Sequence, residues 1–395
     1  MTRPDIVIAG AGPAGSVLAT LLAREGRRVL ILDRATFPRP KPCGESLNPG
    51  GVGALMALGL GEAVERLRPA RMKGWALQSP EGISVRADFG GPDVRAWGIP
   101  RAALDATLLD CARSAGAEVL EGVTVLGCHE GGRGGRPPRL LARTPSGASI
   151  ELEPHVVVGA DGLRSRVSRS LGWHQSPRGP RKASLSFRVR GRREESDRGT
   201  LFLGGRSTLG IAPVSSDGSQ WNVTLVSSPD RSGRIPGAEQ MAGDPSGLVQ
   251  ERMETAGIGW LNGPEVTGGP WASGSFHRPT GKTSGPGVLL VGDAAGYYDP
   301  LTGQGISRAI RGAALAARAI EGALADGRTN PEFQGYSRAL ERMIRPTRTV
   351  QKVIEFVVSR PALRDAALGA LTFTPSIAGL LVRVTGDTVH PESLR

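Results

Sequence analysis

The sequence predicts an α/β protein in which a Rossmann-like domain is joined to an antiparallel β-sheet domain and followed by a helical C-terminal region. Three segments predict the Rossmann-like domain, because each couples a short apolar stretch, typical of a buried strand, to a glycine-containing turn and a helix. They are residues 5–25, 156–172 and 288–325. Short alternating stretches of apolar and polar residues between positions 173 and 271 predict the antiparallel sheet.

The first segment carries a dinucleotide-binding fingerprint. A predicted strand, DIVIA, runs directly into GAGPAG, and an apolar helix follows. In such a fingerprint we expect Gly10 to make the tight turn, Gly12 to admit the pyrophosphate and Gly15 to pack the helix on the strand. A second predicted strand ends at Asp33, 18 residues beyond the last glycine, close to the spacing of about 20 expected for a carboxylate that binds an adenosine ribose. The predicted dinucleotide contacts are Gly10, Gly12, Pro13, Ala14, Gly15, Asp33 and Arg34.

The last segment, GDAAGYYDPLTGQG, follows the apolar run Val288 to Val291. A strand there would present Asp293, and two glycines near the end of the segment would let backbone amides approach a flat anionic ligand. A helix beginning at Ile306 would direct its positive end to the same place, which suits the negative charge of a reduced flavin. The segment therefore predicts flavin contacts from Asp293, Pro300, Gly303, Gln304, Gly305 and Ile306.

The middle segment, VVVGADGLRSRVSRSLG, ends a predicted strand at Asp161-Gly162. With this third motif, the chain resembles the FAD-dependent monooxygenases of the aromatic hydroxylase type and their relatives, the geranylgeranyl reductases and the flavin-dependent halogenases. Gly10 to Gly15 matches the dinucleotide fingerprint of the superfamily, Asp161-Gly162 its DG motif, and Gly292-Asp293 its GD motif.

This resemblance implies a glutathione-reductase-like FAD-binding domain of Rossmann type, with an antiparallel β-sheet substrate domain inserted in it. It also implies FAD contacts from Arg101, within WGIPRAALD, from Val125, and from Asp161 and Gly162. The expected FAD-binding domain is discontinuous and comprises residues 1–73, 97–172 and 272–329. The expected substrate domain comprises 74–96 and 173–271, and the helical region 330–395, with Asn330 and Pro331 at its first helix start.

A proline-rich loop lies between the dinucleotide fingerprint and the DG motif, and we expect it to cover the cofactor. Its KPCGESL sequence resembles both the CGE-type loops of the reductases and the GESL-type loops of the halogenases. Cys43 and Glu45 are therefore candidate catalytic residues beside the isoalloxazine, as proton donor, acid/base or substrate contact. The alternative is that Cys43 is a small buried hydrophobe and Glu45 a solvated carboxylate at a helix start.

The resemblance implies an FAD-dependent oxidoreductase. We expect a monooxygenase that hydroxylates or oxidises a hydrophobic or aromatic small molecule through a C4a-hydroperoxyflavin. No second nucleotide fold is visible, so NAD(P)H would bind transiently at the flavin, or a separate flavin reductase would supply electrons. The alternatives are saturation of isoprenoid double bonds, halogenation, and flavin binding without turnover.

Composition narrows the range of partners. The net charge of +12 comes mainly from arginine, since only five lysines occur. No basic run is interleaved with aromatic residues, so nucleic acid is not expected as a partner.

Three cysteines and five scattered histidines predict neither a disulfide framework nor a metal site. No apolar run approaches the roughly 18 residues of a membrane span, and a cytoplasmic protein is expected. For the apolar stripes beyond residue 330, packing on the flavin domain is favoured over peripheral membrane contact.

Overall fold

The computed structural model describes residues 3–132, 135–176, 182–230, 232, 234, 240, 243–260, 263–274, 276–326 and 331–388. Its central sheet has six strands in the order β18-β19-β12-β1-β2-β8, and every neighbouring pair is parallel except β18–β19. This order confirms the Rossmann-like prediction, because the strands that precede the three predicted motifs lie side by side. The strands are β1 (Ile6–Ala9), β2 (Val29–Asp33), β8 (Glu118–Glu121), β12 (Val156–Gly159), β18 (Ser284–Gly285) and β19 (Val288–Leu290).

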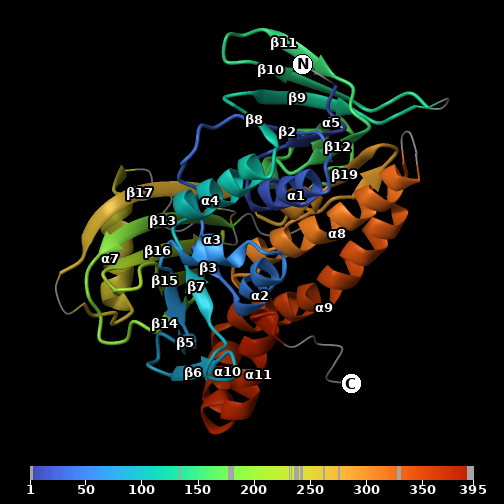
Figure 1. Cartoon of the computed structure of the whole chain (residues 1–395). Helices are drawn as coiled ribbons and strands as arrows, with labels where there is room; N and C mark the ends of the chain where they lie inside the picture. Colours follow the sequence, from blue (N-terminus) through green and yellow to red (C-terminus); the bar gives the residue numbers. More distant parts are fainter. Residues whose placement is uncertain are drawn as a thin grey trace.

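Both faces of the six-stranded sheet are covered, which explains why its strands are almost continuously apolar. On β1, Ile6 and Ile8 face a core shared with α1, α4 and α8, whereas Val7 and Ala9 face a core shared with the three-stranded sheet β11-β10-β9. Figure 1 shows this small sheet at one end of the molecule. The covering elements are α1 (Pro13–Arg24), α4 (Arg101–Ser114), α8 (Gly305–Ala325), β9 (Thr124–His129), β10 (Arg139–Arg143), β11 (Ser149–Leu152) and α5 (Arg166–Ser170).

The second large sheet has seven strands in the order β17-β13-β16-β15-β14-β5-β6. The expected substrate-domain segment 74–96 supplies the hairpin β5–β6, which joins the strands from residues 183–274. The sheet is antiparallel as expected, with one difference: β5 and β14 pair in parallel. The strands are β5 (Gly74–Gln78), β6 (Ser84–Asp88), β13 (Ala183–Arg190), β14 (Arg198–Gly204), β15 (Ser207–Pro213), β16 (Gln220–Ser227) and β17 (Glu265–Gly274), and α7 (Pro245–Thr255) contributes to a core on this sheet.

Short elements connect the two large sheets. Strands β3, β7 and β4 form a three-stranded sheet beside α2 and α3, and two 3-10 turns, η1 and η2, carry the DG and GD motifs. Their bounds are β3 (Ser46–Leu47), α2 (Pro49–Ala57), α3 (Gly61–Glu65), β4 (Ala70–Met72), β7 (Ala96–Gly98), η1 (Gly162–Arg164) and η2 (Gly292–Ala295).

The C-terminal region is helical, as predicted, and consists of α9 (Gln334–Val358), α10 (Pro361–Phe373) and α11 (Pro375–Thr385). The predicted N-cap Asn330 lies outside the described residues, and α9 begins at Gln334 rather than at Pro331. Helix α9 packs on α8, while α10 and α11 contact β6 at the opposite end of the molecule from β9–β11 (Figure 1). Within the described ranges, no single helix is long and apolar enough to cross a membrane; α10 and α11 satisfy the length and composition test only as a pair, bent by 113°.

Candidate active site

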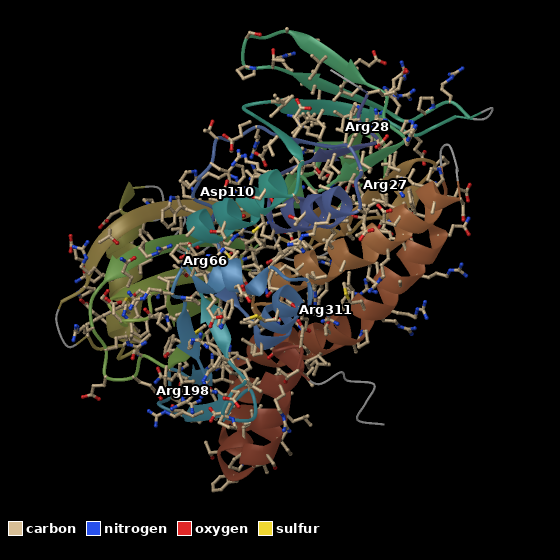
Figure 2. All side chains as sticks on the ribbon, viewed as in Figure 1. Arg27, Arg28, Arg66, Asp110, Arg198 and Arg311 are labelled. Atoms are coloured by element: carbon tan, nitrogen blue, oxygen red, sulfur yellow. The ribbon has the colours of Figure 1, made fainter. Side chains whose placement is uncertain are left out.

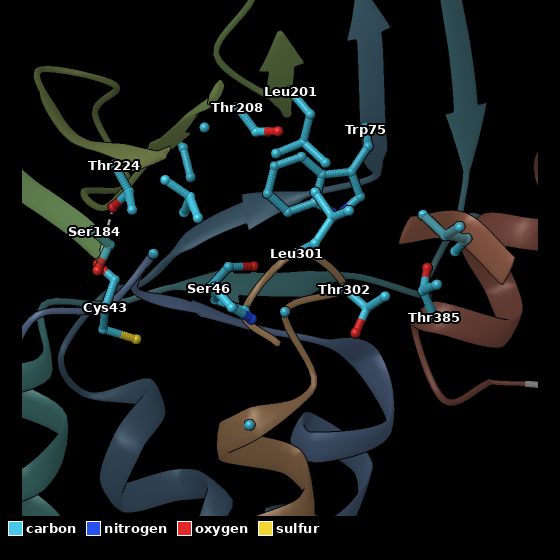
Figure 3. Close-up of a pocket in the computed structure, with 18 of the residues that line it drawn as sticks. Cys43, Ser46, Trp75, Ser184, Leu201, Thr208, Thr224, Leu301, Thr302 and Thr385 are labelled. Atoms are coloured by element: carbon cyan, nitrogen blue, oxygen red, sulfur yellow. Dashed lines mark hydrogen bonds between the residues drawn. The ribbon is translucent and has the colours of Figure 1, made fainter. Parts of the chain in front are cut away.

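One cavity of about 630 Å³ lies where the Rossmann-like domain, the seven-stranded sheet and the C-terminal helices meet. At one end it is bounded by the glycine fingerprint and the segment after β19, and at the other by apolar side chains of α9, α10 and α11. Figure 3 shows Trp75, Leu201 and Leu301 gathered on one side of this cavity, with Cys43 on its own loop away from them. The cavity is the candidate active site.

The fingerprint glycines have the three distinct environments that their predicted roles require. Gly10 has a φ of +108°, and a Cβ there would lie 2.4 Å from the Ala160 carbonyl oxygen. A Cβ on Gly15 would lie 1.9 Å from the Gly10 carbonyl oxygen, which is the close packing of helix on strand. Gly12 borders the cavity, and a Cβ on it would meet only Arg39 Nη2, at 3.9 Å. The space beside Gly12 is therefore open to a ligand.

Asp33 holds the fingerprint loop in place. Its Oδ2 accepts a hydrogen bond of 2.8 Å from the backbone N–H of Ala11, and its Oδ1 accepts one of 2.8 Å from that of Ala35. Asp33 does not line the cavity, and Arg34 is exposed outside it. A ribose contact from Asp33 stays a prediction, and such a contact would use lone pairs left by these backbone bonds.

Two cations that the sequence analysis did not single out stand at the fingerprint end. Lys41 lines the cavity, and a Cβ on Gly162 of the DG motif would lie 3.6 Å from Lys41 Nζ. Burial, and then the nearby charge of Arg101, lower the pKa of Lys41. Arg39 lies closest to Gly12 and is 3.3 Å from Asp105. The available signal was two basic residues in the proline-rich loop, and these cations suit a pyrophosphate.

Arg101 lines the cavity but is also bound firmly within the protein. Its Nε and Nη2 donate to the two carboxylate oxygens of Asp105 at 2.8 and 2.7 Å. Asp105 is fully buried, so this bidentate pair fixes the guanidinium at the start of α4. Val125, by contrast, lies on β9 with its side chain in the core, away from the cavity.

Asp293 of the GD motif faces the cavity with an uncommitted carboxylate. Within the described part of the chain, no hydrogen bond is made by its side chain, and Lys41, Arg101 and Arg308 are the charges that act on it. Burial raises the pKa of Asp293, and the three cations oppose that rise. The carboxylate is free to accept hydrogen bonds from ligand hydroxyl groups.

Asp161 of the DG motif has a different arrangement. Its Oδ2 accepts hydrogen bonds from the backbone N–H groups of Arg166 and Val167, at 2.6 and 3.2 Å, and so caps α5. Its Oδ1 is buried and has no partner among the described residues. Asp161 itself does not line the cavity, whereas Gly162 does.

Glu45 is a buried carboxylate with three donors, which excludes the solvated alternative. It is 3 % exposed and adopts a left-handed φ of +53°. Its carboxylate accepts hydrogen bonds from the Arg101 backbone N–H at 2.8 Å, from Asn222 Nδ2 at 3.2 Å, and from Arg188. Burial raises the pKa of Glu45, and the charge of Arg188 opposes that rise.

Cys43 lines the cavity and is only half-buried, so it is not a fully buried hydrophobe. Its Sγ accepts a hydrogen bond of 3.3 Å from the Glu45 backbone N–H, and its carbonyl oxygen accepts one of 3.3 Å from Thr224 Oγ1. The first bond lies within the loop, and the second holds the loop against β16 of the seven-stranded sheet.

The segment from Tyr297 to Ile306 forms another part of the cavity wall. Gly303 has a φ of +65°, and a Cβ there would meet nothing within 4 Å. Gln304 points away from the cavity: its Nε2 donates to Asp387 Oδ1 at 2.8 Å. Tyr297, which the sequence analysis did not name, lines the cavity, and burial raises its pKa well above the ordinary value.

The structure thus divides the predicted site residues into two groups. Those that line the cavity are Gly12, Pro13, Ala14, Cys43, Glu45, Arg101, Gly162, Asp293, Pro300, Gly303, Gly305 and Ile306. Those that do not are Gly10, Gly15, Asp33, Arg34, Val125, Asp161 and Gln304.

Comparison with known proteins agrees with this geometry. A family model described as "FAD binding domain" matches residues 3–351. The chain belongs to this FAD-binding family. It is 32% identical over 335 residues to the menaquinone reductase of Mycobacterium tuberculosis, an alignment that covers 80% of this chain and 76% of that protein.

Two further proteins similar to this chain are named for other activities. The digeranylgeranylglycerophospholipid reductase of Methanothrix thermoacetophila is 28% identical, with 84% of this chain and 81% of that protein covered. Among solved structures, the myxobacterial chondrochloren halogenase CndH is 25% identical, with a TM-score of 0.79 and coverage of 95% of this chain and 90% of that chain. As a member of the FAD-binding family, the 395-residue chain is an FAD-dependent oxidoreductase.

The residues present fit FAD. The open backbone at Gly12, with Arg39 and Lys41 beside it, suits the pyrophosphate, and the uncommitted carboxylate of Asp293 suits hydroxyl groups of the ribityl chain. The open left-handed turn at Gly303 lets the backbone approach the isoalloxazine edge.

Proposed function

We propose that this enzyme reduces carbon–carbon double bonds in a substrate with a long isoprenoid-like chain. The observation that carries the proposal is the extent of the cavity, which continues past the cofactor end to Val357, Leu368 and Leu371 of the C-terminal helices. An apolar chain gains free energy in proportion to the apolar area that it removes from water, about 25 cal/mol per Å². A flat aromatic substrate would leave this far end of the cavity unfilled.

The relatives support the same reading. Two of them are named as reductases, of menaquinone and of a digeranylgeranyl phospholipid, and both names specify molecules with isoprenoid chains. The menaquinone reductase has the highest identity of the three relatives compared above.

The chain's own residues have separate tasks in this reaction. When bound and reduced, FAD would supply two electrons and one hydrogen to one carbon of the double bond, and a proton must reach the other carbon. Cys43 has a thiol at the cavity and is the better candidate proton donor, because the carboxylate of Glu45 already accepts from three donors. Glu45 then positions the loop. NAD(P)H, or a separate flavin reductase, would restore the reduced cofactor.

Monooxygenation of an aromatic molecule is the second candidate. The observation that favours it is the set of aromatic side chains in the cavity wall, Trp75, Phe276 and Tyr297, on which an aromatic ring would pack. Halogenation is supported by the match to the chondrochloren halogenase.

Product analysis by mass spectrometry separates these reactions. FAD-loaded protein, reduced anaerobically with NADPH or dithionite, is incubated with menaquinone or with a geranylgeranylated glycerophospholipid. Any quinol is first reoxidised in air, because reduction of the quinone ring also adds two hydrogens. The expected product then carries two additional hydrogens for each carbon–carbon double bond saturated. A parallel incubation with oxygen, halide and aromatic probes tests the other candidates. No hydrogen uptake by either isoprenoid, together with addition of one oxygen atom or exchange of hydrogen for halogen on an aromatic probe, would overturn the proposal.

A further inference from the structure

We infer that α10, α11 and the end of α9 form a docking surface for an anionic lipid bilayer, and that the active-site cavity opens through this surface. Sequence patterning alone favoured packing of these helices on the flavin domain. The structure leaves one of their faces uncovered: among the described residues, six of the ten exposed large apolar side chains lie in this short region. They are Val353, Phe356, Leu363, Phe373, Ile377 and Leu381.

The outward part of this apolar surface faces water and lies outside the cavity. Phe373 is 88% exposed, Phe356 is 54% exposed and Leu363 is 45% exposed, and none of the three lines the cavity. Clustered apolar side chains of this size on a water-facing surface are typical of interaction sites, whereas single ones are common on any protein.

The inward part of the same surface is the rim of the cavity. Val353, Ile377 and Leu381 are exposed and also line the cavity, so the cavity reaches the outside between α9 and α11. Because these three side chains are exposed and also line the cavity, they lie at its mouth. The mouth is thus surrounded by the exposed apolar residues named above.

The shape of this region suits shallow insertion. Helices α10 and α11 are bent by 113° at Thr374, and Phe373 is the last residue of α10, next to the break. The two helices lie at one end of the molecule (Figure 1), so their break can enter a flat surface without a clash from the β9–β11 end. An amphipathic element of this kind inserts by about 5 to 10 Å into the headgroup region.

Charge favours an anionic bilayer. The acidic residues from 334 to 388 are all held in ion pairs: Glu341 with Arg348, Glu355 with Lys182, Asp365 with Arg364, and Asp387 with Arg311. Near the apolar patch, the cations Lys352, Arg360 and Arg383 make no ion pair within the described part of the chain. Each cation near an anionic surface strengthens binding by about fivefold.

Arg198, on the neighbouring β14, is already neutralised. Figure 2 shows Arg198 at the same end of the molecule, and its guanidinium is paired with Asp88 and Glu195. It therefore contributes less to an anionic surface than do the cations of α9–α11 that make no ion pair among the described residues.

A bilayer explains these features better than a second copy of the chain. A protein partner on this patch would cover the mouth of the cavity and close the route of the substrate. A bilayer instead places the mouth in the phase where an isoprenoid-chain molecule resides, so this preference rests on the proposed function. The apolar surface and its cations exist independently of it.

Co-sedimentation of FAD-loaded protein with vesicles tests the surface without any turnover. The vesicles are phosphatidylcholine alone, or phosphatidylcholine with phosphatidylglycerol. We expect binding to the mixed vesicles that weakens with added salt, and at least tenfold weaker binding for Phe373→Asp. The matched control is Val266→Asp, which changes an apolar residue that is 49% exposed on β17, outside the patch, and should bind as the wild type does.

The outcomes are distinct. Flavin absorbance and the melting temperature confirm that Phe373→Asp is folded, since the side chain is almost wholly in water. Wild-type protein that stays in the supernatant with both lipids, or Phe373→Asp that binds like the wild type, would overturn the inference. A wild-type dimer in sedimentation velocity that Phe373→Asp dissociates, without vesicle binding, would assign the patch to self-association. Vesicle binding without isoprenoid reduction would count against the proposed function alone.

Discussion

At the scale of single residues, substitutions at two fingerprint glycines should affect two different properties, FAD binding at Gly12 and folding stability at Gly15. Gly12 has free space where a Cβ would be, whereas Gly15 would bring its Cβ to 1.9 Å from a backbone oxygen. The same chemical change therefore has different consequences at two positions only three residues apart.

Replacement of Gly12 by leucine should leave a folded protein that does not retain FAD, because the side chain would occupy the place of the pyrophosphate. Gly15→Ala should instead lower the free energy of unfolding by about 3 kcal/mol, the cost of forcing atoms into a packed interior. Circular dichroism, thermal melting and FAD absorbance after gel filtration measure both effects. Gly53→Leu is the control, because a Cβ there meets nothing within 4 Å; normal FAD retention by Gly12→Leu would contradict the site.

Cys43 and Glu45 are close in sequence but differ in how many partners they have. The Cys43 thiol has two partners, the Glu45 backbone N–H at 3.3 Å and the Arg101 side chain. The Glu45 carboxylate has three, since it is held by Arg101, Arg188 and Asn222. The thiol is thus the group with capacity left for chemistry.

We expect Cys43→Ala to keep FAD and the fold but to lower product formation by roughly a hundredfold to ten-thousandfold, the range of a lost general acid. Glu45→Gln should lower both turnover and stability, because it places an amide donor or a weaker acceptor before Arg188. Single-turnover rates and melting temperatures are the measurements. Cys111→Ala is the matched control, since Cys111 is half-buried on α4 and outside the cavity; equal rates for both cysteine variants would make Cys43 structural.

At the scale of elements, a partly buried lysine joins three segments that are distant in the sequence. Lys182 Nζ lies 2.8 Å from Asp299 and 2.7 Å from Glu355, and the Tyr298 hydroxyl donates to Glu355 at 2.6 Å. The group ties the start of β13 and the turn at Pro300 to α9. It therefore holds the cavity wall formed by residues 297–305.

Glu355→Gln should destabilise the protein by about 2 kcal/mol at pH 7, as expected for hydrogen bonds to a charged group. Burial alone would raise the pKa of Glu355, but the bonds from Lys182 and Tyr298 outweigh burial and lower it. The carboxylate thus adds stability above the ordinary pKa of 4.5, and this contribution is lost as the pH falls through the lowered value. Urea titrations from pH 7 to pH 3 should show the wild-type and variant curves converging in acid; a constant gap would contradict this assignment.

The fold was largely predictable because its signals are local. Strand, glycine turn and helix are contiguous around Gly10, Asp161 and Asp293, and the alternating stretches became strands of the seven-stranded sheet. The parallel pairing of β5 with β14 was not predictable, because alternation of apolar residues is the same in both strand directions.

The site was less predictable because its partners come from afar. Arg188 and Asn222, which hold Glu45, are 143 and 177 residues from it. No spacing rule links such positions, and the contact follows only from the docking of two sheets. Lys41 and Tyr297 were missed for a similar reason, since their types alone do not distinguish a cavity wall from a solvated loop.

At the scale of the whole molecule, the cavity extends from the Rossmann-like domain past the seven-stranded sheet to the C-terminal helices. Its far end is therefore formed by helices that lie outside the dinucleotide-binding motifs. The apolar side chains of α10 in the cavity wall limit the length of chain that fits. Substrate length should therefore be controlled far from the cofactor.

Leu371→Trp should fill part of the apolar end. We expect KM for an isoprenoid substrate of four or more units to rise at least tenfold, with little change for a one-unit analogue and none in FAD content, because only the long chain reaches α10. Steady-state kinetics with both substrates is the measurement. Leu363→Trp, on the outer face of the same helix, is the matched control; equal effects on long and short substrates would show that the chain does not extend there.

Asp387 links the last helix to the cofactor cradle. Its carboxylate accepts hydrogen bonds of 2.8 Å from Asn48, Gln304 and Ser307, the residues that begin or adjoin α2 and α8, and Arg311 stands 3.5 Å away. Coupling between two sites is reciprocal. If an ordered N-terminus of α8 strengthens FAD binding, then bound FAD must in turn stabilise the contacts that join α8 to Asp387 and α11. The order of α11 should therefore depend on whether FAD is bound. Hydrogen exchange along α11 should slow when the protein takes up FAD. In protein without FAD, α11 should be among the first segments to lose order, and it is also the segment that would contact a bilayer.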